Sequence, residues 1–192
     1  MKKLCLSFVL CAAMLLSACS GAAARGRVES FSEALCAAEA LSFQARVRAE
    51  YDDKTAEFTL EYASDEGGCY VTVLSPEMIK GVRAHISDGS TALEYEGVRL
   101  DTGALDDFGL TPMSALAIMV DALRDGYLDS VWEEGDVLSA LFIPSDELGV
   151  ELRLDKYTLT PIGAEISSGG RVRVFAEIEN WAATMPPQDA QE

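Results

Sequence analysis

The residue with the clearest chemistry is Cys19, because its thiol ends a short N-terminal segment suited to export. Met1-Lys2-Lys3 is basic, and the stretch from Leu4 to Leu16 is apolar but too short for a stable membrane anchor. Small residues precede the thiol in Leu16-Ser17-Ala18-Cys19. A thiol at this position can carry a thioether-linked diacylglycerol, so we predict a signal peptide over residues 1–18 and lipidation of Cys19. The alternative is an ordinary secretory signal followed by a chance cysteine.

The other cysteines leave an alternative open. Cys5 and Cys11 lie in the predicted signal peptide, so Cys36 and Cys69 are the remaining thiols of the mature domain. Two thiols in an exported domain can form a disulfide, or they can be separate buried residues. We expect free thiols. Because the sequence has no Cys-x-x-Cys pair and only one histidine, His85, we predict no metal site and no cofactor.

No arrangement of catalytic residues is apparent in the sequence. It contains no Gly-x-Ser-x-Gly elbow, zinc-protease motif or phosphate-binding loop. His85 is out of phase with the apolar positions around it, so we expect it to face solvent. Acidic pairs fall at predicted turns without the ligand spacing of a calcium loop. We therefore predict that the protein is not an enzyme. The aromatic residues Trp132, Tyr157 and Trp181 are interpreted either as core edges or as a patch for a partner.

Charge and length limit where the domain can act. Without residues 1–18 the chain keeps 174 residues, of which 13 are basic and 32 acidic, for a net charge of −19. This length suits one domain with a substantial core. The charge argues against binding nucleic acid or lying flat on anionic lipid. We predict an extracytoplasmic domain held by its lipid to the cell membrane, or to the outer membrane of a Gram-negative source.

Residue patterns divide the mature chain into a tether, one domain and a tail. Residues 19–27 are expected to be the lipidated cysteine and a flexible tether, and residues 183–192 a loose tail. Within the domain, residues 28–182, helical spacing of apolar residues predicts a helix over 28–41. Thr111 as a cap and Pro112 at the first turn predict a second helix that ends at Gly126.

Strict alternation of apolar and polar residues predicts an antiparallel sheet of about ten short strands. Turn residues such as Asp88-Gly89 and Gly169-Gly170 separate the strands. We expect the strands at 43–51, 56–62, 69–73, 82–86, 91–95, 98–100, 130–133, 137–142, 150–154, 158–166 and 171–178. The fold class is therefore α+β.

This order of elements resembles the LolA-like half-barrel family, and the N-terminal motif resembles bacterial lipoprotein signals with their lipobox. Local resemblances lie in Phe43-Gln44-Ala45-Arg46-Val47, in residues 75–81 (Ser-Pro-Glu-Met-Ile-Lys-Gly) and in residues 155–161 (Asp-Lys-Tyr-Thr-Leu-Thr-Pro). The resemblance implies a curved antiparallel sheet whose concave face is closed by the N-terminal and mid-chain helices. A tethering Cys19 departs from the soluble carriers of the family, so the outer-membrane acceptor lipoproteins or the membrane-tethered Gram-positive relatives are nearer.

The resemblance implies a non-catalytic protein that holds an acyl chain or a lipoprotein-like hydrophobic ligand on the concave face. The partner would then be a lipid or a lipoprotein acyl chain. The alternative is a scaffold or sensor that holds a protein of the cell envelope, because some Gram-positive relatives resemble germination-associated lipoproteins. Each apolar residue of this face could equally be ordinary core. The ligand-lining candidates are Phe43, Val47, Phe58, Leu60, Val71, Val73, Leu116, Met119, Val120 and Leu123.

Overall fold

The computed structural model describes residues 21–51, 54–65, 67–87, 90–104 and 110–186. The predicted signal peptide and Cys19 lie outside these residues, as does most of the predicted tail. None of the helices in the described ranges is long and apolar enough to cross a membrane.

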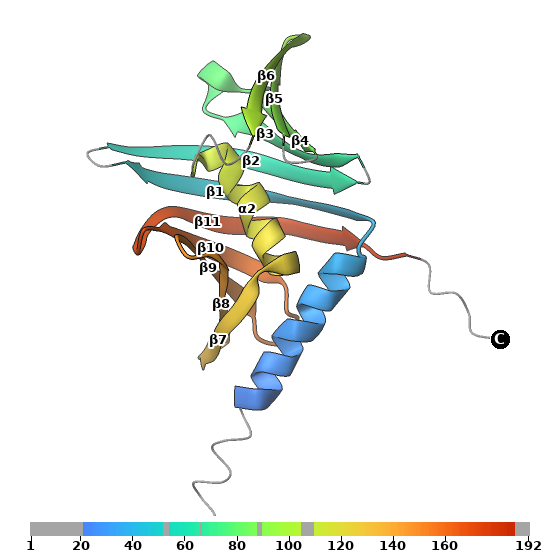
Figure 1. Ribbon diagram of the computed structural model, residues 1–192, viewed down its shortest axis with the longest axis vertical. Coiled ribbons are helices and arrows are strands. Elements are labelled where there is room, and N and C mark those ends of the chain that lie inside the picture. The colour runs from blue at the N-terminus through green and yellow to red at the C-terminus, as the bar shows by residue number, and fades with distance from the viewer. Residues whose placement is uncertain (1–20, 52–53, 66, 88–89, 105–109, 187–192) are drawn as a thin grey trace, which may run out of the picture.

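The described chain forms one open antiparallel sheet of 11 strands with two helices against it (Figure 1). This arrangement confirms the predicted fold class. In spatial order the strands run β6-β5-β4-β3-β2-β1-β11-β10-β9-β8-β7, so β6 and β7 are the two edges. The strands are β1 (Ala40–Tyr51), β2 (Lys54–Asp65), β3 (Gly68–Ser75), β4 (Arg83–Ser87), β5 (Ser90–Tyr95), β6 (Val98–Ala104), β7 (Tyr127–Glu134), β8 (Val137–Ser145), β9 (Leu148–Asp155), β10 (Pro161–Ser168) and β11 (Arg171–Thr184). A short 3-10 helix, η1 (Glu77–Ile79), joins β3 to β4.

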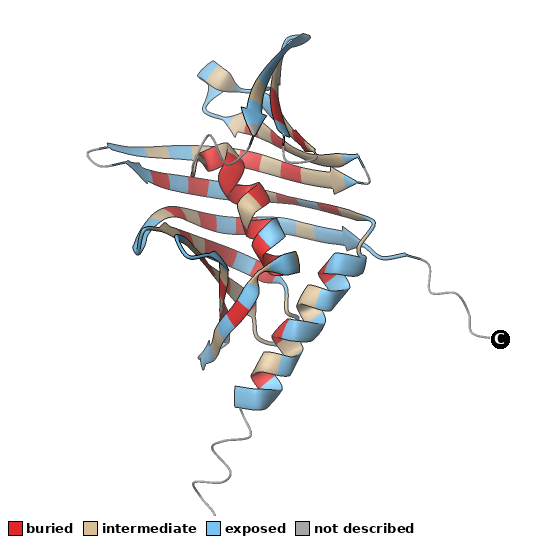
Figure 2. Ribbon diagram, viewed as in Figure 1, coloured by how far each residue is buried: buried red, intermediate tan, exposed pale blue. Residues whose placement is uncertain are grey.

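The alternation of apolar and polar residues along the strands places one side of the sheet in the core and leaves the other side exposed to solvent. In β1 the odd-numbered residues from Leu41 to Ala49 are buried, and the even-numbered residues between them are exposed or half-buried. Register carries the same pattern across the sheet, because Val47 lies opposite Phe58 on one side and Ala176 on the other. The buried side faces the helices (Figure 2) and is called the concave face here; the opposite side is called the convex face.

Helix α2 (Pro112–Asp125) packs across the concave face because almost its whole surface is apolar. The Thr111 hydroxyl accepts a hydrogen bond from the Ser114 amide at 3.1 Å, and the Ser114 hydroxyl accepts one from the Thr111 amide at 2.8 Å. This reciprocal pair satisfies amides that the first turn leaves free. Leu116, Met119, Val120 and Leu123 are fully buried against the sheet. The predicted cap at Thr111 is confirmed.

The N-terminal helix covers residues 21–37, so it begins earlier and ends earlier than the sequence predicted. Residues 21–27, expected to be a flexible tether, instead form the first turns of this helix. Ala24 and Val28 are buried. Arg25 donates to the carbonyl oxygens of Leu128 and Asp129, the latter at 3.2 Å. The helix is thus attached along the β7 edge of the sheet.

Two further boundaries differ from the prediction. Residues 38–41 leave the helix, and β1 begins at Ala40. The strand expected from Thr158 begins instead at Pro161. Before this strand, Asp155 Oδ1 accepts hydrogen bonds from the amides of Tyr157 and Thr158, at 3.0 and 2.8 Å. These bonds hold the residues between β9 and β10 in a turn. A side chain that binds the backbone in this way competes with strand pairing.

Candidate functional site

An apolar cavity of about 300 Å³ lies between the first turn of α2 and the strands near the β6 edge. Its walls come from β2 to β6, η1 and α2. The lining residues are Phe58, Val73, Ile79, Ala84, Ile86, Thr91, Leu93, Thr102, Thr111, Pro112, Met113 and Ser114. The volume is at the lower end of the range of roughly 300–1,000 Å³ for small-molecule pockets. The cavity can therefore hold one slender apolar group rather than several chains.

Four hydroxyl groups interrupt this apolar lining, and three of them have partners. Thr111 and Ser114 bind each other in the cap of α2. The Thr102 hydroxyl donates to the backbone carbonyl of Thr91 at 2.9 Å. The fourth, Thr91 Oγ1, is buried and has no hydrogen-bond partner. Neighbouring atoms cover this oxygen almost completely, so it does not face the open space of the cavity.

The predicted lining residues divide between this cavity and the core. Phe58 and Val73 line the cavity. The other eight pack together where α2 fills the centre of the concave face, and all are at most 2% exposed: Phe43, Val47, Leu60, Val71, Leu116, Met119, Val120 and Leu123. Phe43 stacks on Tyr62, with ring centroids 4.9 Å apart. The open space is thus displaced from the centre of the sheet toward the β6 edge.

Several lining residues were missed by the sequence reasoning. Ile86 and Leu93 lie in phase with the buried positions of their strands, so alternation could have found them. Thr91 and Thr102 gave no signal, because a threonine in a strand is ordinary. Ile79 lies in η1, beyond the reach of a strand pattern.

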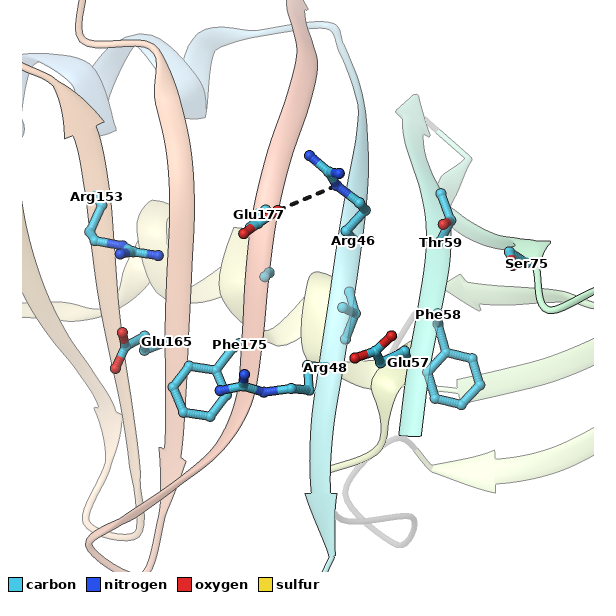
Figure 3. Close-up of a pocket in the computed structure, with 12 residues that line it drawn as sticks. Arg46, Arg48, Glu57, Phe58, Thr59, Ser75, Arg153, Glu165, Phe175 and Glu177 are labelled. Carbon is cyan, nitrogen blue, oxygen red and sulfur yellow. Dashed lines mark ion pairs between the residues drawn. The ribbon is translucent and has the colours of Figure 1, made fainter. Parts of the chain in front are cut away.

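A larger hollow, about 610 Å³, lies on the convex face (Figure 3). One row of paired residues crosses it from Arg153 through Gly163 and Glu177 to Arg46. A neighbouring row contains Glu165, Phe175, Arg48 and Glu57. Arginine and glutamate side chains therefore face one another across the strands, as Figure 3 shows.

Part of the charge in this hollow is paired, whereas Arg153 Nε is buried without a hydrogen-bond partner. Arg46 pairs with Glu177 at 3.3 Å and with Glu179 at 2.6 Å. The Arg48 guanidinium lies 4.3 Å from the centroid of the Phe175 ring. Exposed pairs of this kind contribute little to stability or binding, because water screens them. Between the two hollows, the apolar cavity is the better candidate for a specific ligand.

The thiols and the histidine lie elsewhere. Cys36 and Cys69 are both free, as expected. Burial raises the pKa of the Cys69 thiol to about 11, so it is protonated at neutral pH and a poor nucleophile. His85 lies on the convex face and is half-buried, because its ring stacks on Tyr70 with centroids 4.5 Å apart. Within the described ranges no cluster of side chains could hold a metal ion.

The three aromatic residues singled out from the sequence are in different environments. Trp181 packs against the core. Trp132 is 39% exposed and Tyr157 is 74% exposed. The Tyr157 hydroxyl donates to Asp136 at 2.9 Å. Trp181 is thus a core edge, and the other two are surface residues near the β7 edge.

Comparisons with known proteins give similarity in solved structures only. No family model matches the sequence, and no curated protein matches it. A LolA superfamily protein from Nitrosomonas europaea is 11% identical, with a TM-score of 0.47 over 86% of this chain and 95% of that one. An outer membrane lipoprotein-sorting protein domain from Vibrio parahaemolyticus is 11% identical, with a TM-score of 0.47 over 90% and 94%. A structure of the CwlD amidase with the GerS lipoprotein from Clostridioides difficile aligns at 13% identity, with a TM-score of 0.39 over 88% and 94%.

Proposed function

We propose that the protein is a membrane-anchored, non-catalytic lipoprotein that binds one acyl chain in the cavity beside α2. The observation that carries this proposal is the cavity itself, because its twelve described lining residues are apolar apart from four hydroxyls and none is charged. Moving a flexible hydrocarbon chain from water into such a space is favourable, with a transfer free energy of roughly 0.8 kcal/mol for each methylene. The extracytoplasmic location and the lipid on Cys19 belong to the same proposal.

A cavity-filling variant tests ligand binding. Leu93 is half-buried in β5 and lines the cavity, so Leu93→Trp should fill part of it. Val98→Trp is the matched control, because Val98 is 70% exposed and is not among the lining residues. A fluorescent fatty-acid probe should bind saturably to the unmodified protein and to the control, and at least about tenfold more weakly to Leu93→Trp, a loss of about 1.4 kcal/mol. Equal binding to all three would place the ligand elsewhere, and no saturable binding to any would reject an acyl-binding function.

The anchor is tested separately. Cys19→Ala should move the protein from the detergent phase to the aqueous phase, because no other thiol follows the Leu-x-Ala pattern. Ser20→Ala is the matched control and should stay in the detergent phase. Unchanged partitioning of Cys19→Ala would reject lipidation at this residue.

A second candidate function is binding of an envelope protein. It is favoured by exposed apolar side chains in η1 and the β5–β6 hairpin: Met78 is 90% exposed, Tyr95 44%, Val98 70% and Leu100 62%. Exposed apolar groups gathered in one region are typical of interaction sites. Leu100→Asp should then lose a protein captured from envelope extract, whereas Val172→Asp, at an exposed site on β11, should keep it. If the protein binds the fatty-acid probe but captures no protein from the extract, the second function is rejected and the first stands.

A further inference from the structure

We propose that a second copy of this chain pairs with β6 in antiparallel orientation, so that two sheets join across a twofold axis at Leu100. This inference does not depend on acyl binding. It assigns the open edge of the sheet to another copy of the same chain and not to a different protein of the envelope. Three features of β6 support it: free backbone groups, a self-complementary pair of charges and an exposed apolar row.

The outer edge of β6 offers backbone groups to another strand. Among the described strands β5 is its one neighbour (Figure 1). The turn Glu96-Gly97 joins the two strands with φ values of 48° and 81°, as in a type I′ turn. Such a turn makes Tyr95 and Val98 a hydrogen-bonded pair, and bonded and non-bonded pairs alternate along an antiparallel ladder. The amide and carbonyl groups of Arg99 and Asp101 therefore point away from β5, where they can pair with a further strand.

Charge selects one register for that further strand. Arg99 and Asp101 lie on the same face of β6, with Arg99 Nε 3.3 Å from Asp101 Oδ1. An antiparallel copy centred on Leu100 places Arg99 opposite Asp101 of the second copy, and Asp101 opposite its Arg99. The same register joins the backbone groups of these residues that point outward. A twofold axis at Arg99 or at Asp101 instead places like charges opposite each other, which is destabilising.

The other face of β6 carries an apolar row that this register covers. Leu100 pairs with Leu93 of the cavity wall, so it lies on the concave side. It is 62% exposed, and Val98 on the same side is 70% exposed. In the proposed register Leu100 lies opposite its own counterpart, and Val98 lies opposite Thr102 of the second copy. Pairing therefore removes from water apolar surface that a single copy leaves exposed.

The length of the paired segment limits the strength of the contact. Gly97 and Gly103 have φ values of 81° and 98°, so regular strand geometry is confined to residues 98–102. Five residues a side bury less area than the roughly 1,600 Å² of a standard interface. The many acidic residues of each copy also repel those of the other. We therefore expect a weak dimer, best measured at about 0.15 M salt, where charges are screened beyond roughly 8 Å.

Disulfide cross-linking tests this register on the full chain. Leu100→Cys places two thiols opposite each other across the axis, within the span of a disulfide. Val98→Cys is the matched control on the same strand and face, because the two copies of residue 98 would lie roughly 14 Å apart along the strands. Both variants also carry Cys36→Ala, since Cys36 is an exposed thiol. With copper–phenanthroline and air as the oxidant, Leu100→Cys should form a covalent dimer at least about tenfold faster than Val98→Cys.

Charge reversal tests the register in a second way. Arg99→Asp and Asp101→Arg each place like charges opposite one another in a homodimer. Each should slow the cross-linking of Leu100→Cys by about tenfold. A mixture of the two charge variants restores an arginine–aspartate pair at both positions and should recover the rate. Arg83→Asp, an exposed site on β4 away from the edge, is the control and should leave the rate unchanged.

Each contrary result would overturn the proposal. Equal rates for Leu100→Cys and Val98→Cys, or no covalent dimer from either, would show that β6 does not pair with a second copy in this register. Failure of the mixed charge variants to recover the rate would contradict the opposition of Arg99 and Asp101. A Leu100→Cys product with the mass of this chain joined to a different protein would assign the edge to an envelope partner instead.

Discussion

Trp181 of β11 stacks on Phe43 of β1, with ring centroids 4.9 Å apart and ring planes 24° from parallel. Phe31 of the N-terminal helix lies 6.3 Å from Trp181, measured between ring centroids. The Trp181 ring therefore connects the N-terminal helix to the centre of the sheet, although its residue lies near the C-terminal end of the described chain.

Trp181→Ala should destabilise the fold by about 2–3 kcal/mol, because it removes apolar area and two aromatic contacts. Trp132→Ala is the matched control. Its side chain is 39% exposed and outside the core cluster, so the loss should be below about 1 kcal/mol. Urea denaturation measures both. Equal losses would contradict the role assigned to Trp181.

The attachment of the N-terminal helix can be tested at Val28, which is fully buried. Val28→Asp places a charge in that apolar contact and should release the helix from the domain, because an unpaired buried charge is costly. Hydrogen exchange should then accelerate over residues 21–37 and change little in β1 and β11. Ser30→Asp, an exposed position on the same helix, should leave the exchange rates unchanged. Rapid exchange of the helix in the unmodified protein would show that it is not attached in solution.

The stability of the domain should depend on pH in the alkaline range through Cys69. Burial raises the pKa of this thiol to about 11, well above the value near 8.5 of an unfolded chain. The unfolded protein therefore loses the thiol proton first, and the stabilising contribution present below about pH 8.5 is lost as the pH rises toward 11. Cys69→Ala should flatten the fall in stability between these values by up to about 2 kcal/mol. Cys36→Ala, at an exposed thiol, should keep the steep fall, and an unchanged slope in Cys69→Ala would contradict the assignment.

Two glycines should respond to alanine in opposite directions. A Cβ at Gly163 would lie 2.8 Å from Arg153 Nη2 and 3.0 Å from the Ala176 carbonyl oxygen, so Gly163→Ala should destabilise the sheet by about 1–3 kcal/mol. Gly26 lies inside the N-terminal helix, and a Cβ there would meet nothing within 4 Å, so Gly26→Ala should stabilise the protein by up to about 1 kcal/mol. Thermal unfolding measures both shifts. Stabilisation by Gly163→Ala would mean that Arg153 moves aside freely.

The sequence predicted the sheet well because its information is local. The alternation of Phe43 to Tyr51 and the cap at Thr111 each fix an element through neighbouring residues. The start of the N-terminal helix could not be read in this way, since its first turns are small residues and two arginines. They are held there by contacts with Leu128 and Asp129, about a hundred residues later.

The candidate site was predicted only in part for a similar reason. Periodicity identifies residues that face inward, such as Leu60 and Leu123. It does not show whether they pack on each other or line an open space, because that depends on where α2 lies on the sheet. The cavity forms at the N-terminal end of α2, where the helix no longer covers the concave face of the sheet. That place depends on packing between distant elements, and no local pattern of residues records it.

The hydrogen bonds between Arg25 and β7 have a geometric consequence for a lipidated chain. If Cys19 carries a lipid, the attachment point is two residues before Gly21, the first described residue of the N-terminal helix, and Arg25 of that helix binds β7. The cavity lies toward the opposite edge of the sheet, several strand spacings of about 4.8 Å away. A lipid on Cys19 and a ligand in the cavity would then be located at opposite ends of the strand order.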